Sequence, residues 1–271
     1  MKRAVFESYT DGAPGPDGIP FFFYQHFWEL VKKDLIAMFE VFRKGELAIH
    51  ELNFAMLTLI PKEADASSMK KFRPISLLNC SFKIFTKVLT NRLAMILQRL
   101  IASNQSAFLK GRYILESVVT AHEILHSIHS TKRQGLVLKL DYEKAFDKVD
   151  LDFLEELLRK RGFGDKWVHW ILQVTKGGSV GVRLNINKSD FFLTGKGLRQ
   201  GDPISALLFV IAIEPLHKIL VLATRKGLVL MIRGRGAMEG PSPRPVVLCC
   251  YAPNRAGPRA QRDQAPYRQT D

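Results

Sequence analysis

Two short stretches decide the fold: residues 139–149 read KLDYEKAFDKV and residues 199–203 read RQGDP. The first stretch continues an apolar run, Leu136 to Leu140, that has the length and composition of a buried strand. Asp141 therefore stands where a strand ends, and a carboxylate there is well placed to hold a metal ion. The second stretch is a glycine turn that precedes an apolar segment of helical length, Ile204 to Leu222.

Composition limits the class of protein. The chain has 271 residues, 46% of them hydrophobic, which is enough for one or two domains with a sizeable core. Its formal net charge of +14 favours a polyanionic partner, most often nucleic acid, and the alternative is a basic protein without such a partner. Cys80, Cys249 and Cys250 lack zinc spacing and a disulfide pattern, which favours a reducing, intracellular compartment rather than secretion. The longest apolar run, Ile204 to Ile213, is too short for a membrane span, so we expect no membrane partner.

Hydrophobic periodicity predicts a mixture of helices and strands, and hence an α+β protein. The predicted helices cover residues 24–43, 82–101, 115–130, 152–161, 166–175 and 204–222. The predicted strands cover residues 56–60, 73–78 and 136–140, with a hairpin formed by residues 180–186 and 191–194.

The chain changes character after about residue 230. Residues 231–271 contain seven Arg and no Lys, and they hold six of the 13 prolines. A segment without an apolar period cannot offset its ordering entropy, so we expect residues 231–271 to be a disordered Arg/Pro-rich tail. It is either a natural basic tail or a foreign sequence joined by a frameshift or fusion, and the abrupt loss of Lys favours the foreign origin.

Five sequence blocks follow one another in a characteristic order. They are residues 14–20 (PGPDGIP), residues 59–62 (LIPK) with 72–79 (FRPISLLN), residues 105–112 (QSAFLKGR), residues 141–149 (DYEKAFDKV) and residues 197–205 (GLRQGDPIS). As an ordered set, over roughly residues 10 to 228, they resemble the reverse-transcriptase domain of LINE-type (non-LTR) retrotransposons. Reverse transcriptases encoded by group II introns are similar in the same blocks.

The resemblance implies a right-hand polymerase architecture without a thumb: a fingers-like region over residues 1–135 and a partial palm over residues 136–230. It implies RNA-directed DNA synthesis, with an RNA template, a DNA primer and deoxynucleoside triphosphates as partners and Mg²⁺ as cofactor. It also implies action in the nucleus or cytoplasm. The sequence leaves the oligomeric state open.

The resemblance assigns the metal-binding, catalytic carboxylate to Asp141 and a further ligand to the backbone carbonyl of Tyr142. It makes Phe146 the bulky gate that excludes a 2′-hydroxyl. Without the resemblance, Asp141 could equally be a turn residue at a strand end, and Phe146 could be a core aromatic.

The resemblance also assigns nucleotide contacts to four residues outside that block. Lys62 and Arg73 match positions that approach the triphosphate and its base, a role that suits cations. Gln200 and Gly201 match the loop that contacts nucleotide and template. For Lys62, a solvated loop lysine remains the alternative.

One expected feature is missing from the sequence. Two-metal polymerases need a second carboxylate block, usually a paired Asp-Asp, and this chain has no Asp-Asp dipeptide. Past Glu214 the acids are Glu239, Asp263 and Asp271. We therefore expect a domain truncated before the paired-Asp block, with a weak or incomplete Mg²⁺ site and no catalysis. The alternative is a non-catalytic RNA-binding remnant.

A different class of enzyme is suggested by His122-Glu123-Ile124-Leu125-His126, which has the HExxH spacing of a zinc hydrolase. No third ligand completes a recognised zinc pattern, and three fixed positions arise readily by chance. We interpret this segment as part of a partly buried amphipathic helix.

Overall fold

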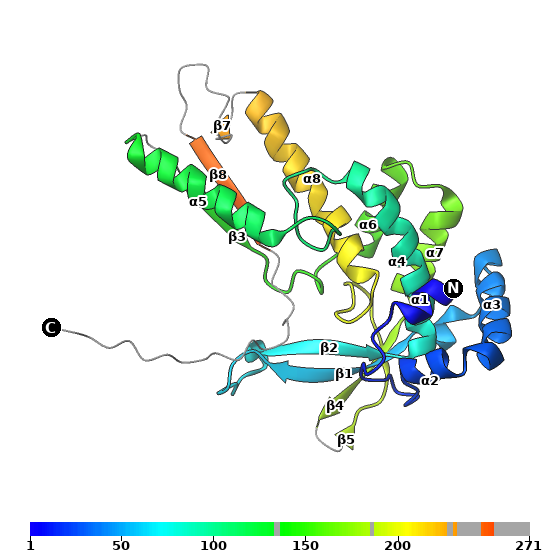
Figure 1. The fold of residues 1–271 in the computed structure, drawn as a ribbon. Coiled ribbons are helices and arrows are strands. Elements are labelled where there is room, and N and C mark those ends of the chain that lie inside the picture. Colours follow the sequence, from blue (N-terminus) through cyan, green and yellow to red (C-terminus); the bar gives the residue numbers. More distant parts are fainter. Residues whose placement is uncertain (133–135, 185–186, 227–229, 232–244, 252–271) are drawn as a thin grey trace.

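The computed structural model describes residues 1–132, 136–184, 187–226, 230–231 and 245–251. Helices and strands are mixed along the chain and build an α+β protein with two sheets (Figure 1). The helices are α1 (Lys2–Phe6), α2 (Phe21–His26), α3 (Trp28–Lys44), α4 (Cys80–Leu100), α5 (Ile114–Ser130), α6 (Leu151–Lys160), α7 (Asp165–Thr175) and α8 (Ser205–Arg225). The strands are β1 (Phe54–Pro61), β2 (Phe72–Leu78), β3 (Leu136–Asp141), β4 (Ser179–Leu184), β5 (Asn187–Lys188), β6 (Phe192–Leu193), β7 (Leu230–Met231) and β8 (Pro245–Tyr251).

The larger sheet is mixed, with strand order β2-β1-β4-β5 and with β6 also paired to β4. β1 and β2 form a long antiparallel hairpin that projects from the body of the molecule (Figure 1). β1 also pairs in parallel with β4, beginning at Phe54 opposite Ser179. This sheet therefore takes strands from both sides of residue 135, where the sequence predicts a boundary between fingers and palm.

The smaller sheet is parallel, in the order β3-β8-β7. Asp141, at the end of β3, is in register with Tyr251 at the end of β8. β8 lies within the segment that the sequence predicts to be disordered. Met231 of β7 also belongs to that segment, and its residues 232–244 and 252–271 lie outside the described residues.

The main core is organised around α4. Five of its fully buried residues recur at helical spacing and form a stripe, which packs with buried residues of α6, α7 and α8. Those residues of the stripe are Phe82, Phe85, Leu89, Leu93 and Leu97. A second cluster joins α1, α2 and α3 to the first turns of α4, through Cys80 and Ile84. Because α4 contributes to both clusters, it connects the N-terminal helices to the rest of the fold.

One predicted helix differs from the structure. The segment predicted as one helix over residues 24–43 is two helices, because the backbone of Phe27 leaves the helical region (φ −96°, ψ 26°). Neither Gly nor Pro marks this break, so the sequence does not reveal it.

Within the described residues, α8 is the one helix long and apolar enough to cross a membrane. Its first half, Ser205–Ile211, is buried in this fold, as core helices are.

The end of α4 is closed by Arg112, from the block at residues 105–112. Its guanidinium donates to the carbonyl oxygens of Ile101 (3.3 Å) and Gln105 (2.7 Å) and to the side-chain oxygen of Gln98 (3.2 Å). A cation at a helix C-terminus also offsets the negative end of the helix dipole. Arg112 thus has a structural role that explains its place in this block.

We predict that Arg112→Ala lowers the free energy of unfolding by about 1–3 kcal/mol, because carbonyls at the end of α4 lose a charged donor. Chemical denaturation measures this change. The matched control is the exposed neighbour Lys110→Ala, which should stay within about 0.5 kcal/mol of the unaltered protein. Equal effects of the two substitutions would contradict the capping role.

Candidate nucleotide-binding site

Residues 197–202 form a turn that contains two of the predicted site residues, Gln200 and Gly201, and contacts a third, Phe146. The amide of Leu198 donates to the carbonyl of Phe146, and the amide of Gly197 donates to the carbonyl of Val149, both at 2.8 Å. On the other side, the carbonyl of Gln200 accepts a hydrogen bond from the amide of Ser76 on β2, at 2.7 Å. The 197–202 turn therefore joins the loop after β3 to the β1–β2 hairpin.

Two glycines permit this close contact. Gly201 has a φ of +117°, and a Cβ atom there would lie 2.5 Å from the carbonyl oxygen of Ser76. Gly197 has a φ of +89°, and its Cβ would lie 2.7 Å from the carbonyl oxygen of Asp147. A side chain at either position would meet backbone rather than a movable group, so the glycines are a geometric requirement of the turn.

Arg199 points from the turn into the protein. It is hydrogen-bonded through Nη1 to the side-chain oxygen of Asn53 and lies over the ring of Phe82, 5.9 Å from the centroid. Burial lowers the pKa of Arg199, and the charge of Asp202 opposes that shift. A buried guanidinium needs such partners, because an unpaired buried charge is strongly unfavourable.

Asn53 completes a second set of contacts. Its side-chain amide donates to the carbonyl of Lys176 (3.3 Å), just past the end of α7. Its backbone carbonyl accepts from the amide of Ser179 (3.0 Å), where β4 begins. Asn53 is fully buried and stands just before β1, so it links Arg199 to β1, β4 and α7 at once.

Asp202 ends the turn and is also buried. Its carboxylate accepts from the amide of Ile204 (3.2 Å), next to the start of α8, and from the side chain of Thr86 on α4. Burial raises the pKa of Asp202, although the bond from Thr86 and the charge of Arg199 lower it. The RQGDP sequence thus serves mainly to anchor the turn, with the backbone of Gln200 and Gly201 against β2.

Asp141 lies at the rim of a cavity of about 440 Å³ between the loop after β3 and α8. Asp141 is exposed, and Glu143 and Asp150 also line the cavity. Glu143 forms an ion pair with Lys148 (3.5 Å), and Asp150 caps α6 by accepting from the amides of residues 152 and 153. The apolar side of the cavity includes Val149, Phe153, Phe209, Ala212 and Ile213.

These acids do not form a dense metal site. Within the described residues, no group of three His, Cys, Asp or Glu side chains is arranged to hold a metal ion. The same holds for His122, Glu123 and His126, which are exposed on α5. The oxygen donors at Asp141 are of the type that Mg²⁺ prefers, but they do not make up a two-ion site.

Phe146 is half-buried between two aromatic residues, one from the block at residues 105–112 and one from α8. Its ring stacks on Phe209 of α8, with centroids 4.7 Å apart and an interplanar angle of 17°. It meets Phe108 edge-on, with centroids 6.3 Å apart and an angle of 86°. Next to it, Asp147 is partly buried, and burial raises the pKa of its carboxyl group while Lys144 opposes the shift.

The two predicted cations lie along the hairpin. Arg73 is half-buried on β2, opposite Ile60 and three residues before Ser76, which is about 10 Å along a strand. Lys62 follows the end of β1 and is exposed, and its ammonium donates to the carbonyl of Lys70 (2.8 Å). Hydrogen bonds thus connect the 197–202 turn to Phe146 and to Ser76 on β2. Arg73 lies on the same strand as Ser76, and Lys62 lies farther out.

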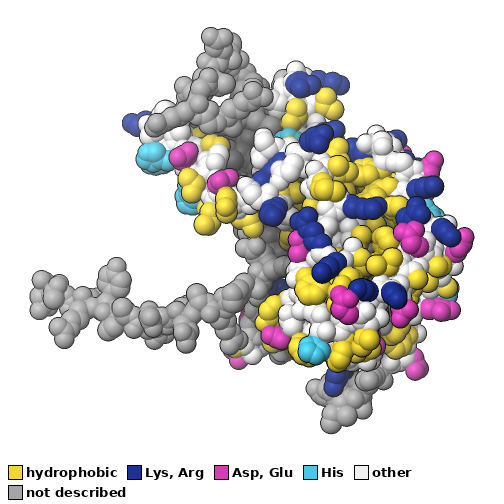
Figure 2. Space-filling model, turned by 45° about the vertical axis from the view of Figure 1, so that its right-hand side comes forward, with side chains coloured by type: hydrophobic (Ala, Val, Ile, Leu, Met, Phe, Trp, Pro, Cys, Tyr) yellow, Lys and Arg dark blue, Asp and Glu magenta, His cyan; other side chains and the backbone are white. Residues whose placement is uncertain are grey.

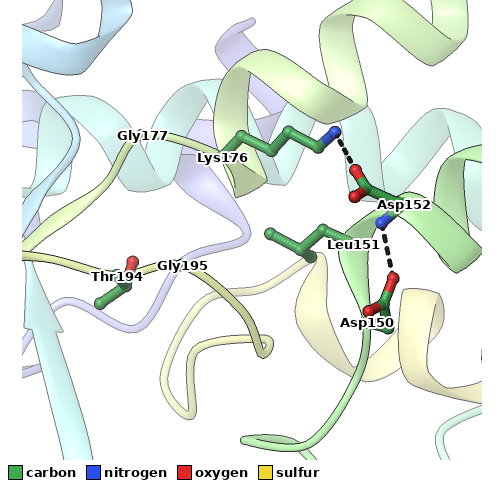
Figure 3. Close-up of a pocket in the computed structure, with 7 residues that line it drawn as sticks. All are labelled: Asp150, Leu151, Asp152, Lys176, Gly177, Thr194 and Gly195. Carbon is green, nitrogen blue, oxygen red and sulfur yellow. Dashed lines mark hydrogen bonds and ion pairs between the residues drawn. The ribbon is translucent and has the colours of Figure 1, made fainter.

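A second cavity, of about 280 Å³, lies beside the start of α6 (Figure 3). Lys176 points toward Asp152 and forms ion pairs with Asp152 (2.7 Å) and Glu155 (3.3 Å). Asp150 is directed at the amide of Asp152 as a helix cap (Figure 3). The ion pairs of Lys176 therefore connect α6 to the residue that follows α7.

Sequence analysis missed Asn53, Phe108 and Phe209 as site residues. Phe108 stood within a quoted block, but no pattern indicated its contact. Phe209 is one apolar residue in an apolar helix, and Asn53 is a single polar residue before a strand. Only their tertiary contacts distinguish them.

We predict that Asn53→Ala lowers the free energy of unfolding by about 2–4 kcal/mol, because the buried guanidinium of Arg199 loses its partner. Denaturant titration gives this value. Asn104→Ala, which removes an exposed amide on a loop, is the control and should have a small effect. An Asn53→Ala protein as stable as this control would disprove the role of Asn53.

We also predict a pH-dependent effect of Asp202→Asn. The folded-state pKa of Asp202 is raised above its ordinary value of 3.8. At a pH between the unfolded-state and the folded-state pKa, the unfolded chain therefore releases a proton that the folded chain keeps. The contribution of Asp202 to stability therefore falls as pH rises through that window, whereas Asn cannot titrate. Melting curves from pH 3 to 8 should show the variant gaining stability relative to the unaltered protein. A constant difference across this range would refute the shift.

Comparison with known proteins identifies the family. The sequence profile described as "Reverse transcriptase (RNA-dependent DNA polymerase)" matches residues 60–252. A transposon TX1 uncharacterized 149 kDa protein of Xenopus laevis is 35% identical over 204 residues, which cover 75% of this chain and 16% of that protein. A Pol polyprotein from the type-1 retrotransposable element R2 of Nasonia vitripennis is 26% identical over 198 residues, which cover 73% of this chain and 19% of that protein. The polyprotein from the type-2 element R2DM of Drosophila melanogaster is 26% identical over 171 residues, which cover 63% of this chain and 16% of that protein.

This chain thus spans less than a fifth of the length of these relatives. The profile match includes the hairpin strand β2, the loop after β3 and the 197–202 turn. The chain belongs to the reverse-transcriptase (RNA-dependent DNA polymerase) family and contains a reverse-transcriptase domain of the kind found in non-LTR retrotransposon proteins.

Proposed function

We propose that this chain is the nucleotide- and template-binding part of a reverse transcriptase and does not catalyse DNA synthesis by itself. In this proposal the fingers region is residues 1–135 and the partial palm is residues 136–230. The observation that carries it is the 197–202 turn. Its hydrogen bonds to Phe146 and Ser76 connect the proposed sugar-contacting loop to the proposed fingers hairpin.

The incoming deoxynucleoside triphosphate would bind between these two parts. Arg73 offers a planar cation on β2, and Lys62 offers an exposed ammonium farther along the hairpin, a pairing that suits a polyphosphate. Gln200 and Gly201 present backbone and a side chain beside β2, where a base and its template partner would lie. Phe146 would lie against the sugar.

Mg²⁺ would be held at the same site by the carboxylate of Asp141 and the carbonyl of Tyr142, together with phosphate oxygens of the nucleotide. The ion supplies charge neutralisation for the phosphates. Two-metal phosphoryl transfer needs further carboxylates. The described residues contain no cluster of three suitable ligands, and the whole sequence contains no Asp-Asp pair. This absence supports nucleotide binding without catalysis in this chain.

An RNA template and a DNA primer are the proposed macromolecular partners. The net charge of +14 supports a polyanionic ligand. α4 carries four cations, Lys83, Lys87, Arg92 and Arg99, and no acidic residue. Lys and Arg side chains are spread across the middle of the face shown in Figure 2.

Primer extension tests the catalytic part of the proposal. With an RNA template, a DNA primer, Mg²⁺ and deoxynucleotides, we expect no extension from the unaltered protein and none from Asp141→Ala, because the second carboxylate is missing. Extension by the unaltered protein that is lost in Asp141→Ala would show a working two-metal site and overturn the proposal.

Salt dependence tests the binding part. We expect the affinity for an RNA–DNA primer–template to fall steeply between 50 and 200 mM salt, because phosphate contacts release counterions. Filter binding or anisotropy at several salt concentrations measures the slope. A slope near zero, or no binding at low salt, would contradict a nucleic-acid-binding function.

A further inference from the structure

We infer that Phe209 and Phe108 are positioning residues for Phe146: they hold its ring in the place from which, as the resemblance implies, it would exclude a 2′-hydroxyl. The selectivity part rests on the proposed function, in which Phe146 lies against the sugar. The positioning part rests on geometry alone. Phe209 lines the cavity beside Asp141 but is only 3% exposed, so we expect it to act through the ring of Phe146 rather than by its own contact with the nucleotide.

The stack with Phe209 fixes the plane of the Phe146 ring. The two rings are nearly parallel, at 17°, with centroids 4.7 Å apart. Phe209 is itself immobilised, since it is 3% exposed and belongs to the buried first half of α8. A flat contact with a fixed ring removes rotation of Phe146 about its second side-chain torsion.

The contact with Phe108 restrains the ring from a second direction. The two rings meet at 86°, with centroids 6.3 Å apart. Phe108 has a φ of +62°, which is rare for a bulky residue and persists only where the surroundings enforce it. The backbone in the block at residues 105–112 is thus held in an unfavourable conformation that directs this ring toward Phe146.

The backbone of Phe146 is held as well as its side chain. Its carbonyl accepts the hydrogen bond from Leu198, and the same loop contains Lys144 with a φ of +51°. The ring therefore has little freedom to move away when a larger sugar approaches. Exclusion of one hydroxyl group depends on the position of the ring within a fraction of its own width, so loosening the stack should reduce selectivity more than affinity.

The first test needs no nucleotide. A single 4-fluorophenylalanine at position 146 should give one fluorine resonance shifted by the ring current of Phe209. In Phe209→Leu we expect this resonance to move toward the unfolded value and broaden. The control is Phe85→Leu. Phe85 is a fully buried ring of the same core, and the structure records its ring contacts with Phe39 and Phe42. In this variant the resonance should stay in place. An unmoved resonance in Phe209→Leu would overturn the positioning role.

The second test measures selectivity as the ratio of dissociation constants for GTP and dGTP with Mg²⁺. We expect Phe209→Leu to reduce this ratio about three- to tenfold, the range expected from losing an aromatic pair, while dGTP affinity changes little. Phe108→Leu should act in the same direction, and it provides the test if Phe209→Leu does not fold. Phe85→Leu should leave the ratio unchanged.

The outcomes separate the two claims. A response of the fluorine signal together with an unchanged ratio would overturn the selectivity part of the inference. Failure of the unaltered protein to bind either nucleotide would contradict the proposed function, and selectivity with it, while the fluorine result would still decide the positioning role.

Discussion

The fold depends on the hydrogen bonds and close packing of the 197–202 turn. Six consecutive residues contact the loop after β3, the start of β1, the middle of β2, α4 and the start of α8. These contacts are possible because Gly197 and Gly201 allow backbone to meet backbone. The half-buried Arg199 and the buried Asp202 also have hydrogen-bond partners inside the protein. These elements are far apart in sequence, and the turn joins them through hydrogen bonds.

The same constraint places the chemistry. Because the turn holds the carbonyl of Phe146 on one side and the amide of Ser76 on the other, the proposed sugar contact and the proposed phosphate contacts share one rigid connection. The aromatic ring of Phe146 is then oriented by Phe108 and Phe209, which come from two further parts of the chain. Asp141 has fewer structural constraints: it is exposed, beside a cavity, at the end of a parallel strand. The proposed sugar contact is thus held by more interactions than the proposed metal ligand.

Much of the local structure could be predicted from the sequence, because periodicity reports which face of an element is buried. The predicted helix over residues 82–101 and the observed α4 nearly coincide, and the strands at 56–60 and 73–78 lie inside β1 and β2. The family could be recognised from five ordered blocks, and the profile match confirms it. The parallel pairing of β1 with β4 and the break at Phe27 were not foreseen, because neither leaves a local signal. Asn53 and Phe209 were missed for the same reason: their roles arise from tertiary contacts.

Hydrogen exchange on Gly201→Ala tests whether the 197–202 turn acts as one joint. The new Cβ would push against the carbonyl of Ser76, so the hydrogen bond between Gln200 and Ser76 should break. If the turn acts as one joint, the amides of Ser76, Gly197 and Leu198 should lose protection together, while amides in the middle of α4 stay protected. Loss of protection at Ser76 alone, with Gly197 and Leu198 unchanged, would show that the contacts on the two sides of the turn are independent and would contradict this account.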